Sequence, residues 1–356
     1  MKRGNDWKRK ILAVLKIPEL GLDTLTKGIA MTSLNGENAT TQRTLKQPLT
    51  YVGIGLHTGK KVSMIVRPAS DGQGIHFHRK DVPAGTGFIP ARWYNIVETR
   101  MSTVLGNEHG VTVSTVEHLL AALRGCGVDN AFVELDGPEV PIMDGSAAPF
   151  VSVIERIGTV SQDITRHAIW IHQPIEVRTK DKFAIMMPSN VQRITVSIDF
   201  DNPVVGAQTL SVELVNEAFV KSVARARTFG FANELATLHK AGLIQGGSLN
   251  NAILVDGERI VNDEGLRFKD EFVRHKILDC YGDLSLAGAP ILGHYYTHKP
   301  GHELNAMFLQ KLFDSYSAWS YISIDEYQRL IGQAPQTEDL ENNASSKTAE
   351  TKSQPL

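Results

Sequence analysis

Cysteine is scarce in this chain of 356 residues, which has only two, Cys126 and Cys280. Two thiols are too few for a disulfide scaffold, and too few for a zinc site built from cysteine alone. A reducing compartment is therefore expected, and we predict that the protein is cytoplasmic.

Long hydrophobic runs and an excess of one charge are missing as well. No stretch of about 18 uninterrupted apolar residues occurs, which excludes an integral membrane protein with a transmembrane helix. Lys and Arg number 37 against 39 for Asp and Glu, and a net charge of −2 gives no strong field for holding nucleic acid. With 42% hydrophobic residues, the chain can bury the core of one large or two medium domains. We expect a monomer whose partner is a small molecule.

The two ends of the chain differ in composition from the middle. Residues 1–40 combine a short basic amphipathic stretch with a polar run, and we expect a weakly ordered extension, with Met31 as an alternative start. The apolar run within it is too short for a signal peptide, whereas the basic stretch leaves peripheral contact with an anionic membrane open. Residues 336–356 contain no aromatic residue and are expected to form a disordered tail.

Between these ends, strand-like patterns alternate with helical ones, which predicts an α+β or α/β arrangement. We expect strands at residues 62–67, 131–135, 169–177 and 194–200. We expect helices at residues 116–124, 147–157, 271–287 and 303–321. The polar residues 159–166 are a candidate boundary between a first domain, residues 41–160, and a second, residues 161–335.

A glycine-rich segment at residues 53–61 invites interpretation as a phosphate-binding loop, but its spacing is wrong. Gly55 and Gly59 enclose three residues where a Walker A loop needs four, and Lys61 stands where that loop needs Ser or Thr. A hairpin turn is the favoured interpretation. The pair Gly246 and Gly247 also predicts a turn.

One candidate for chemistry is the pair Glu117 and His118 at the expected start of a helix. Ser114 and Glu117 have the spacing of a capping box, so Glu117 could serve only as a helix cap. Adjacent helical positions point about 100° apart, which would also let His118 bind a metal while Glu117 reaches a bound water. The pair alone leaves both interpretations open.

A second candidate is the expected helix that contains His275 and Asp279. These residues are four apart on one helical face, a spacing that suits two ligands of one ion, and Asp283 extends the polar stripe. A solvated face with an ion pair is the alternative. If the helix is buried, however, a cation shared with His118 would satisfy all three side chains.

Two imidazoles and one carboxylate, with a fourth position left for water, are the donor set of a catalytic zinc site. Zinc lowers the pKa of bound water toward about 7, so Glu117 could act as the general base of a hydrolysis. Fe²⁺ on the same ligands is an alternative that the sequence does not separate from Zn²⁺. His302, just before a helix, is a candidate proton donor whose charged form Asp283 would favour, and a surface histidine is the alternative.

Six short motifs follow one another along the chain: GLHTGK at 55–60, TVEHL at 115–119, PIMDGS at 141–146, RARTFGF at 225–231, FVRHK at 272–276 and GH at 301–302. Together they resemble the UDP-3-O-acyl-N-acetylglucosamine deacetylases, the zinc amidohydrolases of bacterial lipid A synthesis. The resemblance covers roughly residues 41–330 and keeps the family's motif order. It therefore leaves out the extension at the N-terminus.

The resemblance implies two domains of similar topology, each a mixed sheet packed on helices with a small insert, and an active site between them. It implies one catalytic Zn²⁺ with three ligands, His118, His275 and Asp279. It also implies roles in catalysis: Glu117 is the base, His302 is the general acid assisted by Asp283, and Thr228 polarises the acetyl carbonyl.

The resemblance implies substrate contacts as well. Lys276, Lys182 and Lys299 would face the diphosphate or the sugar, and Phe200 would lie near the nucleoside. The second insert, about residues 229–255, would form a passage for the acyl chain. Phe231 and Gly247 would line it.

The implied reaction is hydrolysis of the 2-acetamido group of UDP-3-O-(3-hydroxyacyl)-N-acetylglucosamine to acetate and a free amine. A zinc deacetylase for a different acylated amino sugar is one alternative. A protein that binds a nucleotide-linked lipid without chemistry is another, and the set Glu117, His302 and Thr228 argues against it. The preferred acyl length does not follow from the sequence.

Overall fold

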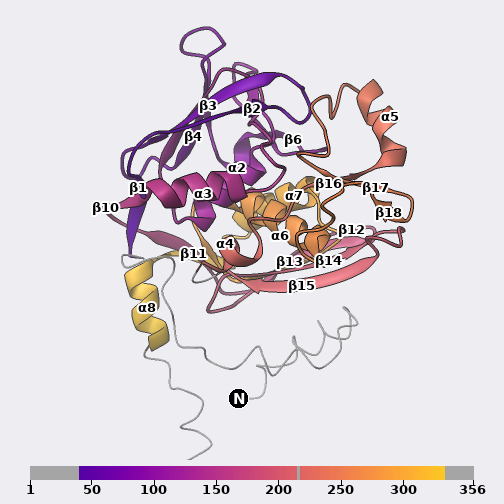
Figure 1. The fold of residues 1–356 in the computed structure, drawn as a ribbon. Helices are drawn as coiled ribbons and strands as arrows, with labels where there is room; N and C mark the ends of the chain where they lie inside the picture. The colour runs from indigo at the N-terminus through magenta and orange to yellow at the C-terminus, as the bar shows by residue number, and fades with distance from the viewer. Residues whose placement is uncertain (1–39, 215–216, 333–356) are drawn as a thin grey trace, which may run out of the picture. The chain divides into compact units, whose positions relative to one another are not determined.

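The computed structural model describes residues 40–214 and 217–332 (Figure 1). Of the expected extension only Thr40 is described, and the expected tail at residues 336–356 lies outside the described residues. The residues described up to Tyr327 belong to one compact unit, and those from Gln328 onward belong to a second. In the described ranges, no helix is long and apolar enough to cross a bilayer.

The first half of the compact unit is built on a five-stranded sheet with the order β2-β3-β9-β4-β5. Strand β9, the last of the five in the chain, lies in the middle, antiparallel to β3 and parallel to β4. Alternate side chains of β3 are buried, as expected for a sheet with one face on the core. The strands are β2 (Leu49–Ile54), β3 (Lys61–Pro68), β4 (Ile75–Arg79), β5 (Phe88–Pro90) and β9 (Ala131–Leu135).

The second half repeats this topology in a sheet with the order β12-β13-β20-β14-β15. Strand β20 again comes last in the chain and lies in the middle, antiparallel to β13 and parallel to β14. The strands are β12 (Ile175–Thr179), β13 (Lys182–Met187), β14 (Arg193–Asp199), β15 (Ala207–Glu213) and β20 (His294–His298). The equal topology of the two sheets confirms the expected α+β class with two similar halves.

Each half places one helix before and one helix after its central strand. These are α2 (Glu117–Gly125) and α3 (Ala148–Ile157) around β9, and α6 (Glu271–Leu284) and α7 (His302–Asp314) around β20. In Figure 1 they lie between the strands of the two halves, and all of α2 is buried. Helices α2 and α6 touch at Gly282, where an added Cβ would lie 2.0 Å from the Glu117 carbonyl oxygen. Only glycine permits this approach.

Each half also carries a three-stranded insert between its fourth strand and its first helix, as expected. The first insert consists of β6 (Ile96–Glu98), β7 (Val104–Gly106) and β8 (Thr112–Val113). The second consists of β16 (Phe229–Phe231), helix α5 (Ala232–Lys240), β17 (Ile253–Asp256) and β18 (Arg259–Ile260). Every residue of α5 is at least partly exposed.

The remaining elements connect these parts. Residues 159–166, expected as a polar boundary, largely form a strand, β10, which pairs antiparallel with β1. Strand β11 lies between β19 and β21 in a separate sheet. The elements are β1 (Thr41–Leu45), η3 (Trp93–Asn95), β10 (Thr159–Thr165), β11 (His167–Ile171), α4 (Ala218–Ser222), η4 (Ser285–Ala287), β19 (Ile291–Leu292), β21 (Trp319–Ser323) and α8 (Ile324–Gly332).

Two sequence expectations about local structure are wrong. The helix expected at 303–321 ends at Asp314, because the Trp319 indole N–H donates to the Leu312 carbonyl (2.7 Å) and the chain then enters β21. The strand expected at 169–177 is two strands in different sheets, separated at residues 172–174, where Pro174 lacks the N–H that a strand interior needs. The helices expected at 116–124, 147–157 and 271–287 are confirmed, the last as α6 followed by η4.

Candidate active site

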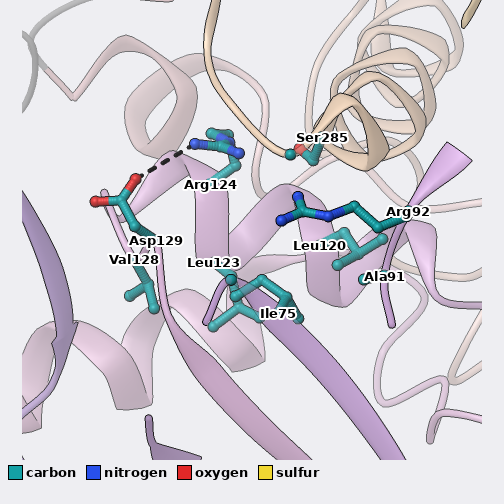
Figure 2. A pocket seen from close by; sticks show the side chains of 11 residues that line it. Ile75, Ala91, Arg92, Leu120, Leu123, Arg124, Val128, Asp129 and Ser285 are labelled. Atoms are coloured by element: carbon teal, nitrogen blue, oxygen red, sulfur yellow. Dashed lines mark ion pairs between the residues drawn. The ribbon is translucent and has the colours of Figure 1, made fainter. Parts of the chain in front are cut away.

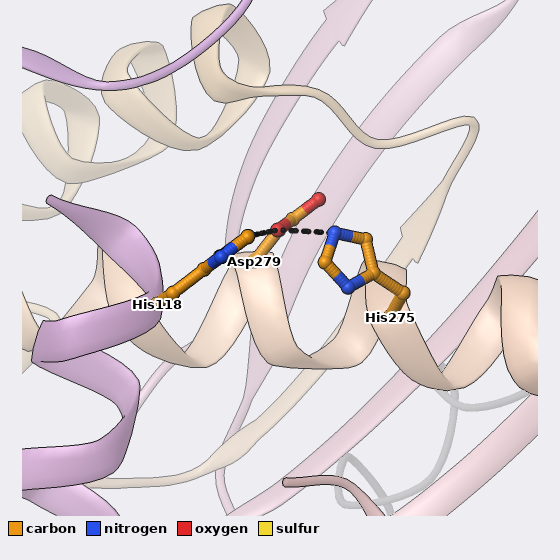
Figure 3. Close-up of side chains that lie close together, drawn as sticks. All are labelled: His118, His275 and Asp279. Atoms are coloured by element: carbon orange, nitrogen blue, oxygen red, sulfur yellow. Dashed lines mark ion pairs between the residues drawn. The ribbon is translucent and has the colours of Figure 1, made fainter. Parts of the chain in front are cut away.

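Three side chains from helices α2 and α6 converge where the two helices pack together. His118 of α2 and His275 and Asp279 of α6 offer donor atoms that all lie within 4.8 Å of one another (Figure 3). Asp279 Oδ1 lies 3.6 Å from His118 Nε2 and 3.3 Å from His275 Nε2. His275 and Asp279 are only 2% and 5% exposed, so the alternative of a solvated face with an ion pair is wrong.

The protonation of this group fits a divalent cation. His275 Nδ1–H donates to the Ala226 carbonyl (3.0 Å), which leaves the lone pair of Nε2 facing Asp279. Burial lowers the pKa of His275 to about 3, so the ring is neutral. Burial opposes ionisation of Asp279, but the charged Lys276 beside it helps to hold the pKa of that carboxyl well below its usual range. Two imidazoles and a carboxylate would fit zinc.

The second carboxylate oxygen of Asp279 is already engaged by a charged side chain. Lys276 Nζ donates to Asp279 Oδ2 (2.9 Å), so Oδ1 is the oxygen that faces both histidine rings. The carboxylate raises the pKa of Lys276, against the effect of burial, and keeps this ammonium charged. Among the described residues, His118 Nδ1 has no hydrogen-bond partner.

Glu117 is the first residue of α2 and does not cap the helix. The Ser114 hydroxyl donates to the Pro138 carbonyl (3.3 Å), which excludes the capping-box interpretation. Instead, Glu117 Oε2 accepts the N–H of Thr103 (3.1 Å), and Oε1 lies 3.7 Å from His302 Nε2. Burial raises the pKa of Glu117 to about 7, a value that suits a base at neutral pH.

His302 is the first residue of α7 and its side chain is only 10% exposed, so the surface-histidine interpretation is wrong. Its Nδ1 lies 2.9 Å from Asp283 Oδ2, which orients the ring so that Nε2 faces Glu117. Burial lowers the pKa of His302, but the carboxylates of Asp283 and Glu117 outweigh it and raise the pKa to about 9. His302 is therefore charged at neutral pH.

Asp283 is itself held by two residues that sequence reasoning missed. The Thr103 hydroxyl donates to Asp283 Oδ1 (2.5 Å), and Asn305 Nδ2 donates to Oδ2 (2.8 Å). Tyr295 fixes the amide of Asn305 through a hydrogen bond of 2.9 Å. Of these residues, only Asn305 could have been predicted from the sequence, because it lies three residues after His302, on the same face of the expected helix.

The glycine-rich hairpin is tied to the start of α2 by Glu139. Residues 55–60 form the expected hairpin turn, closed by the hydrogen bond from Gly55 N–H to the Lys60 carbonyl (2.9 Å). Glu139 accepts the backbone N–H of Thr58 (2.9 Å) and the hydroxyl of Thr115 (3.0 Å). Thr115 has φ +57°, which is strained for a β-branched residue, and it lies two residues before Glu117.

His57, in the same hairpin, is a further residue that sequence reasoning left without a role. It is 7% exposed, and neither ring nitrogen has a hydrogen-bond partner in the described part of the chain. Burial lowers the pKa of His57, and the neighbouring His302 and His118 lower it further, so the ring is neutral. The His57 ring thus has one hydrogen-bond donor and one acceptor available beside the site. In the sequence, only its place in the GLHTGK motif could have indicated a role for His57.

The residues expected to contact substrate begin at an aromatic cluster beside His275. The ring of Phe229 lies 6.4 Å from His275, 5.7 Å from Phe200 and 6.2 Å from Phe231. Lys276 Nζ lies 5.6 Å from the same Phe229 ring. Thr228 precedes Phe229 and is half-buried, and its N–H donates to the Gly145 carbonyl (2.8 Å). The cluster therefore connects His275, one of the three candidate metal ligands, to Phe200.

Two more expected contacts, Lys299 and Lys182, lie at the Phe200 end of this cluster. Lys299 Nζ pairs with Asp181 (3.1 Å) and with Asp199 (3.4 Å), the residue before Phe200. Lys182 is the exposed first residue of β13 and follows Asp181. Both ammonium groups therefore flank the same carboxylate.

Gly247 lies in the loop after α5, in the turn that its sequence predicts. Its N–H donates to the Ile244 carbonyl (3.0 Å). The closest approach between backbones, however, is at Gly246, where an added Cβ would lie 2.2 Å from the Gly55 carbonyl oxygen. This contact joins the second insert to the hairpin that carries His57.

The loop that supports His275 is anchored by a buried ion pair. Arg227 Nε lies 2.9 Å from Glu271 Oε1, and the two side chains are 2% and 0% exposed. Glu271 is the first residue of α6, so this pair fixes the Ala226 carbonyl relative to the helix that carries its hydrogen-bond partner.

Comparison with known proteins agrees with this geometry. A family model described as UDP-3-O-acyl N-acetylglycosamine deacetylase matches residues 42–314. A protein named UDP-3-O-acyl-N-acetylglucosamine deacetylase in Acidithiobacillus ferrooxidans is 47% identical to this chain, over 80% of this chain and 94% of that protein. A protein of the same name in Syntrophotalea carbinolica is 45% identical, over 80% of this chain and 92% of that protein. A protein of the same name in Haemophilus influenzae is 43% identical over 81% and 95%. The chain therefore belongs to the UDP-3-O-acyl-N-acetylglucosamine deacetylase family, as its six motifs predict.

Proposed function

We propose that this protein hydrolyses the N-acetyl group of UDP-3-O-(3-hydroxyacyl)-N-acetylglucosamine, releasing acetate, in lipid A biosynthesis. The observation that carries the proposal is the convergence of a buried donor set with a carboxylate of raised pKa and a charged histidine. Family membership supports the substrate. Two free cysteines, one of them buried, support a reducing compartment such as the cytoplasm.

His118, His275 and Asp279 would hold one Zn²⁺, and Fe²⁺ is the alternative ion for the same donors. When bound, the ion supplies a Lewis acid and lowers the pKa of a coordinated water. The hydrogen bond from His275 Nδ1 to Ala226 and the ion pair of Lys276 with Asp279 orient two of the three ligands before any ion binds.

The remaining polar residues divide the proton transfers between them. Glu117, with a pKa of about 7, accepts a proton from the attacking water, and His302, with a pKa of about 9, donates one to the leaving amine nitrogen. Asp283 keeps His302 charged and oriented. Thr228 donates a hydrogen bond to the acetyl carbonyl as charge develops on its oxygen.

Substrate binding would use the surface that leads away from the metal-binding residues. Lys276, Lys182 and Lys299 provide positive charge for the diphosphate or sugar, and Phe200 provides a ring beside the nucleoside. The second insert, with Phe231 and the Gly247 turn, would hold the acyl chain. No residue of its helix α5 is buried, so the helix is accessible to an apolar ligand.

The experiment that tests this function pairs metal analysis with an acetate-release assay on the purified full chain. We expect one zinc per chain, turnover of the UDP-linked acyl sugar, loss of turnover with a chelator and recovery with added Zn²⁺. Equal turnover of the acyl sugar without UDP would favour a different amino-sugar substrate. Bound zinc without any acetate release would favour the non-catalytic lipid-binding alternative and contradict the proposal.

A further inference from the structure

A cavity of about 410 Å³ lies apart from the residues assigned above, and arginines line it. Arg92 and Arg166 contribute to its wall. A gap of about 10 Å³, the size of one water molecule, adjoins it and adds Arg124 (Figure 2). The two spaces share Gly74, Arg92, Asp129 and Gly288. None of the proposed catalytic or metal-binding residues lines either space.

Arg124 is a buried cation with little to compensate its charge. It is 9% exposed, and in the described ranges its Nη1 has no hydrogen-bond partner. Its nearest carboxylate oxygen, Asp129 Oδ1, is 3.5 Å away, longer than the 2.7–2.9 Å of a charge-assisted hydrogen bond. Burial lowers the pKa of Arg124; Asp129 opposes this shift, and the neighbouring Arg166 and Arg92 add to it. A buried guanidinium that has only a long ion pair, and one nitrogen without a hydrogen bond, is costly unless a further group satisfies it.

Asp129 gives Arg124 only a long ion pair, because each of its oxygens also accepts a shorter hydrogen bond. Oδ1 accepts from Arg166 Nε (2.9 Å), and Oδ2 accepts from the backbone N–H of Arg43 (2.9 Å). Its single charge is therefore shared between two arginines. Asp129 serves mainly to hold Arg166 in the cavity wall.

Arg92 faces the same space without a partner. Figure 2 shows its guanidinium pointing toward Arg124 from the opposite side of the gap. Between residues 40 and 332, outside the two undescribed positions, the Arg92 side chain has no hydrogen bond or ion pair. It lies flat over Gly288, where an added Cβ would come within 1.7 Å of Nη1. Gly288, at φ +83°, thus leaves room for this guanidinium.

Three guanidinium groups against one carboxylate leave a formal charge of +2 around the two spaces. A phosphate monoester carries a charge of about −1.5 to −2 at pH 7, so its charge matches this excess. Arginine forks also bind phosphate oxygens in pairs.

The rest of the cavity wall fits an aromatic ring. Four aromatic side chains line it, and two of them, Tyr94 and Tyr321, are 63% and 56% exposed. Trp93 and Phe313 stack on each other at 5.1 Å behind them. The volume lies within the range of natural sites for small organic ligands.

We propose that this cavity, defined by Arg92, Arg124, Arg166 and the four aromatic residues, binds a phosphate monoester that carries an aromatic ring, the chemistry of a nucleoside monophosphate. The phosphate lies between Arg92 and Arg166, with Arg124 behind, and the ring lies against Tyr94 and Tyr321. The proposal is independent of the deacetylase reaction, because no residue is shared with it.

The test is calorimetric titration of the metal-free full chain with AMP, adenosine and inorganic phosphate. We expect one AMP site, with adenosine binding at least tenfold more weakly. Arg92→Gln should weaken AMP at least tenfold, since a hydrogen bond to a charged group is lost, whereas Arg259→Gln, at an exposed arginine, should leave AMP binding unchanged. Trp93 should report binding by fluorescence, and Trp93→Phe should remove that signal.

Three results would overturn the proposal directly. The first is an AMP affinity that is the same in Arg92→Gln as in the parent. The second is no AMP binding at millimolar concentration. The third is weakening by Lys299→Gln instead of Arg92→Gln, which would place AMP at the substrate site.

Arg124→Leu provides a second, independent measurement. If Arg124 is held for a ligand, this variant should weaken AMP while its melting temperature without ligand stays equal or rises, because an uncompensated buried charge is removed. A lower melting temperature combined with unchanged AMP affinity would identify Arg124 as a structural partner of Asp129 and contradict the proposal.

Discussion

Asp283→Asn should change how the reaction depends on pH while leaving the metal in place. The Asp283 carboxylate accepts from His302 Nδ1 and is the main cause that raises the pKa of His302 to about 9, against the effect of burial. Asparagine keeps the size and one oxygen but removes the charge. His302 in the variant should therefore titrate at or below the ordinary histidine value of about 6.5.

The size of the effect follows from the fraction of His302 that carries its proton. At pH 8, a group with a pKa of about 9 is about 91% protonated, whereas one with a pKa of about 6.5 is about 3% protonated. The variant should then lose roughly thirtyfold in kcat/KM at pH 8. At pH 6.5 the two fractions are about 100% and 50%, so the loss should be only about twofold. The alkaline limb of the profile should move to lower pH.

The assay is acetate release from the UDP-linked acyl sugar between pH 5.5 and 9.5, with zinc content measured on the same samples. Asp136→Asn is a matched control, because Asp136 is a carboxylate that only accepts an exposed hydrogen bond from Ser63 N–H (2.6 Å). Its profile should equal that of the parent. A uniform loss at every pH in Asp283→Asn, with the alkaline limb unmoved, would refute the role of Asp283. The two limbs of the pH profile report the coupled titration of Glu117, His302 and the bound water, and neither limb is the pKa of a single residue.

Four other substitutions test the site and its support. Glu117→Gln should keep zinc but lower kcat at least about a hundredfold, because the base is not a ligand, and near-normal kcat would disprove its role. His275→Ala should lose zinc as well as activity, and one zinc per chain in that variant would contradict the ligand assignment. Gly282→Ala forces a Cβ against the Glu117 carbonyl, so urea unfolding should show a loss of about 1–3 kcal/mol, and unchanged stability would mean that α2 and α6 can separate without cost. Arg227→Met leaves the Glu271 carboxylate buried and unpaired, which should cost about 3–5 kcal/mol in the same measurement, and a cost near zero would refute the anchoring role of the pair.

That His275 and Asp279 share one face of a helix could be predicted, because this depends on local periodicity alone. His275 and Asp279 are four apart, and helix geometry places them on one face wherever the helix lies. That His118 joins them depends on the packing of α2 against α6, which no local pattern contains. The decisive residue for that packing, Gly282, reads in the sequence only as a weak helix former. Only the resemblance carried by the six motifs predicted that these two helices contribute to one site.

The support network could not be predicted for the same physical reason. Thr103 belongs to the first insert and is 180 residues from Asp283 in the sequence, so no local spacing relates the two residues. The end of α7 was missed because Trp319, in the next strand, satisfies the Leu312 carbonyl, and the apolar pattern beyond Asp314 continues without a break. Tertiary contacts determine both the Thr103–Asp283 hydrogen bond and the end of α7, and local sequence propensity predicts neither.

The repeated sheet order has a consequence for ancestry. Each half alone supplies an incomplete centre: α2 brings Glu117 and His118, and α6 brings His275, Asp279 and Asp283. If both halves descend from one duplicated gene, a single ancestral copy could have assembled such a centre only by pairing with a second copy around a twofold axis. Fusion would then have freed the two helices to diverge, so that only one of them carries a residue such as Glu117.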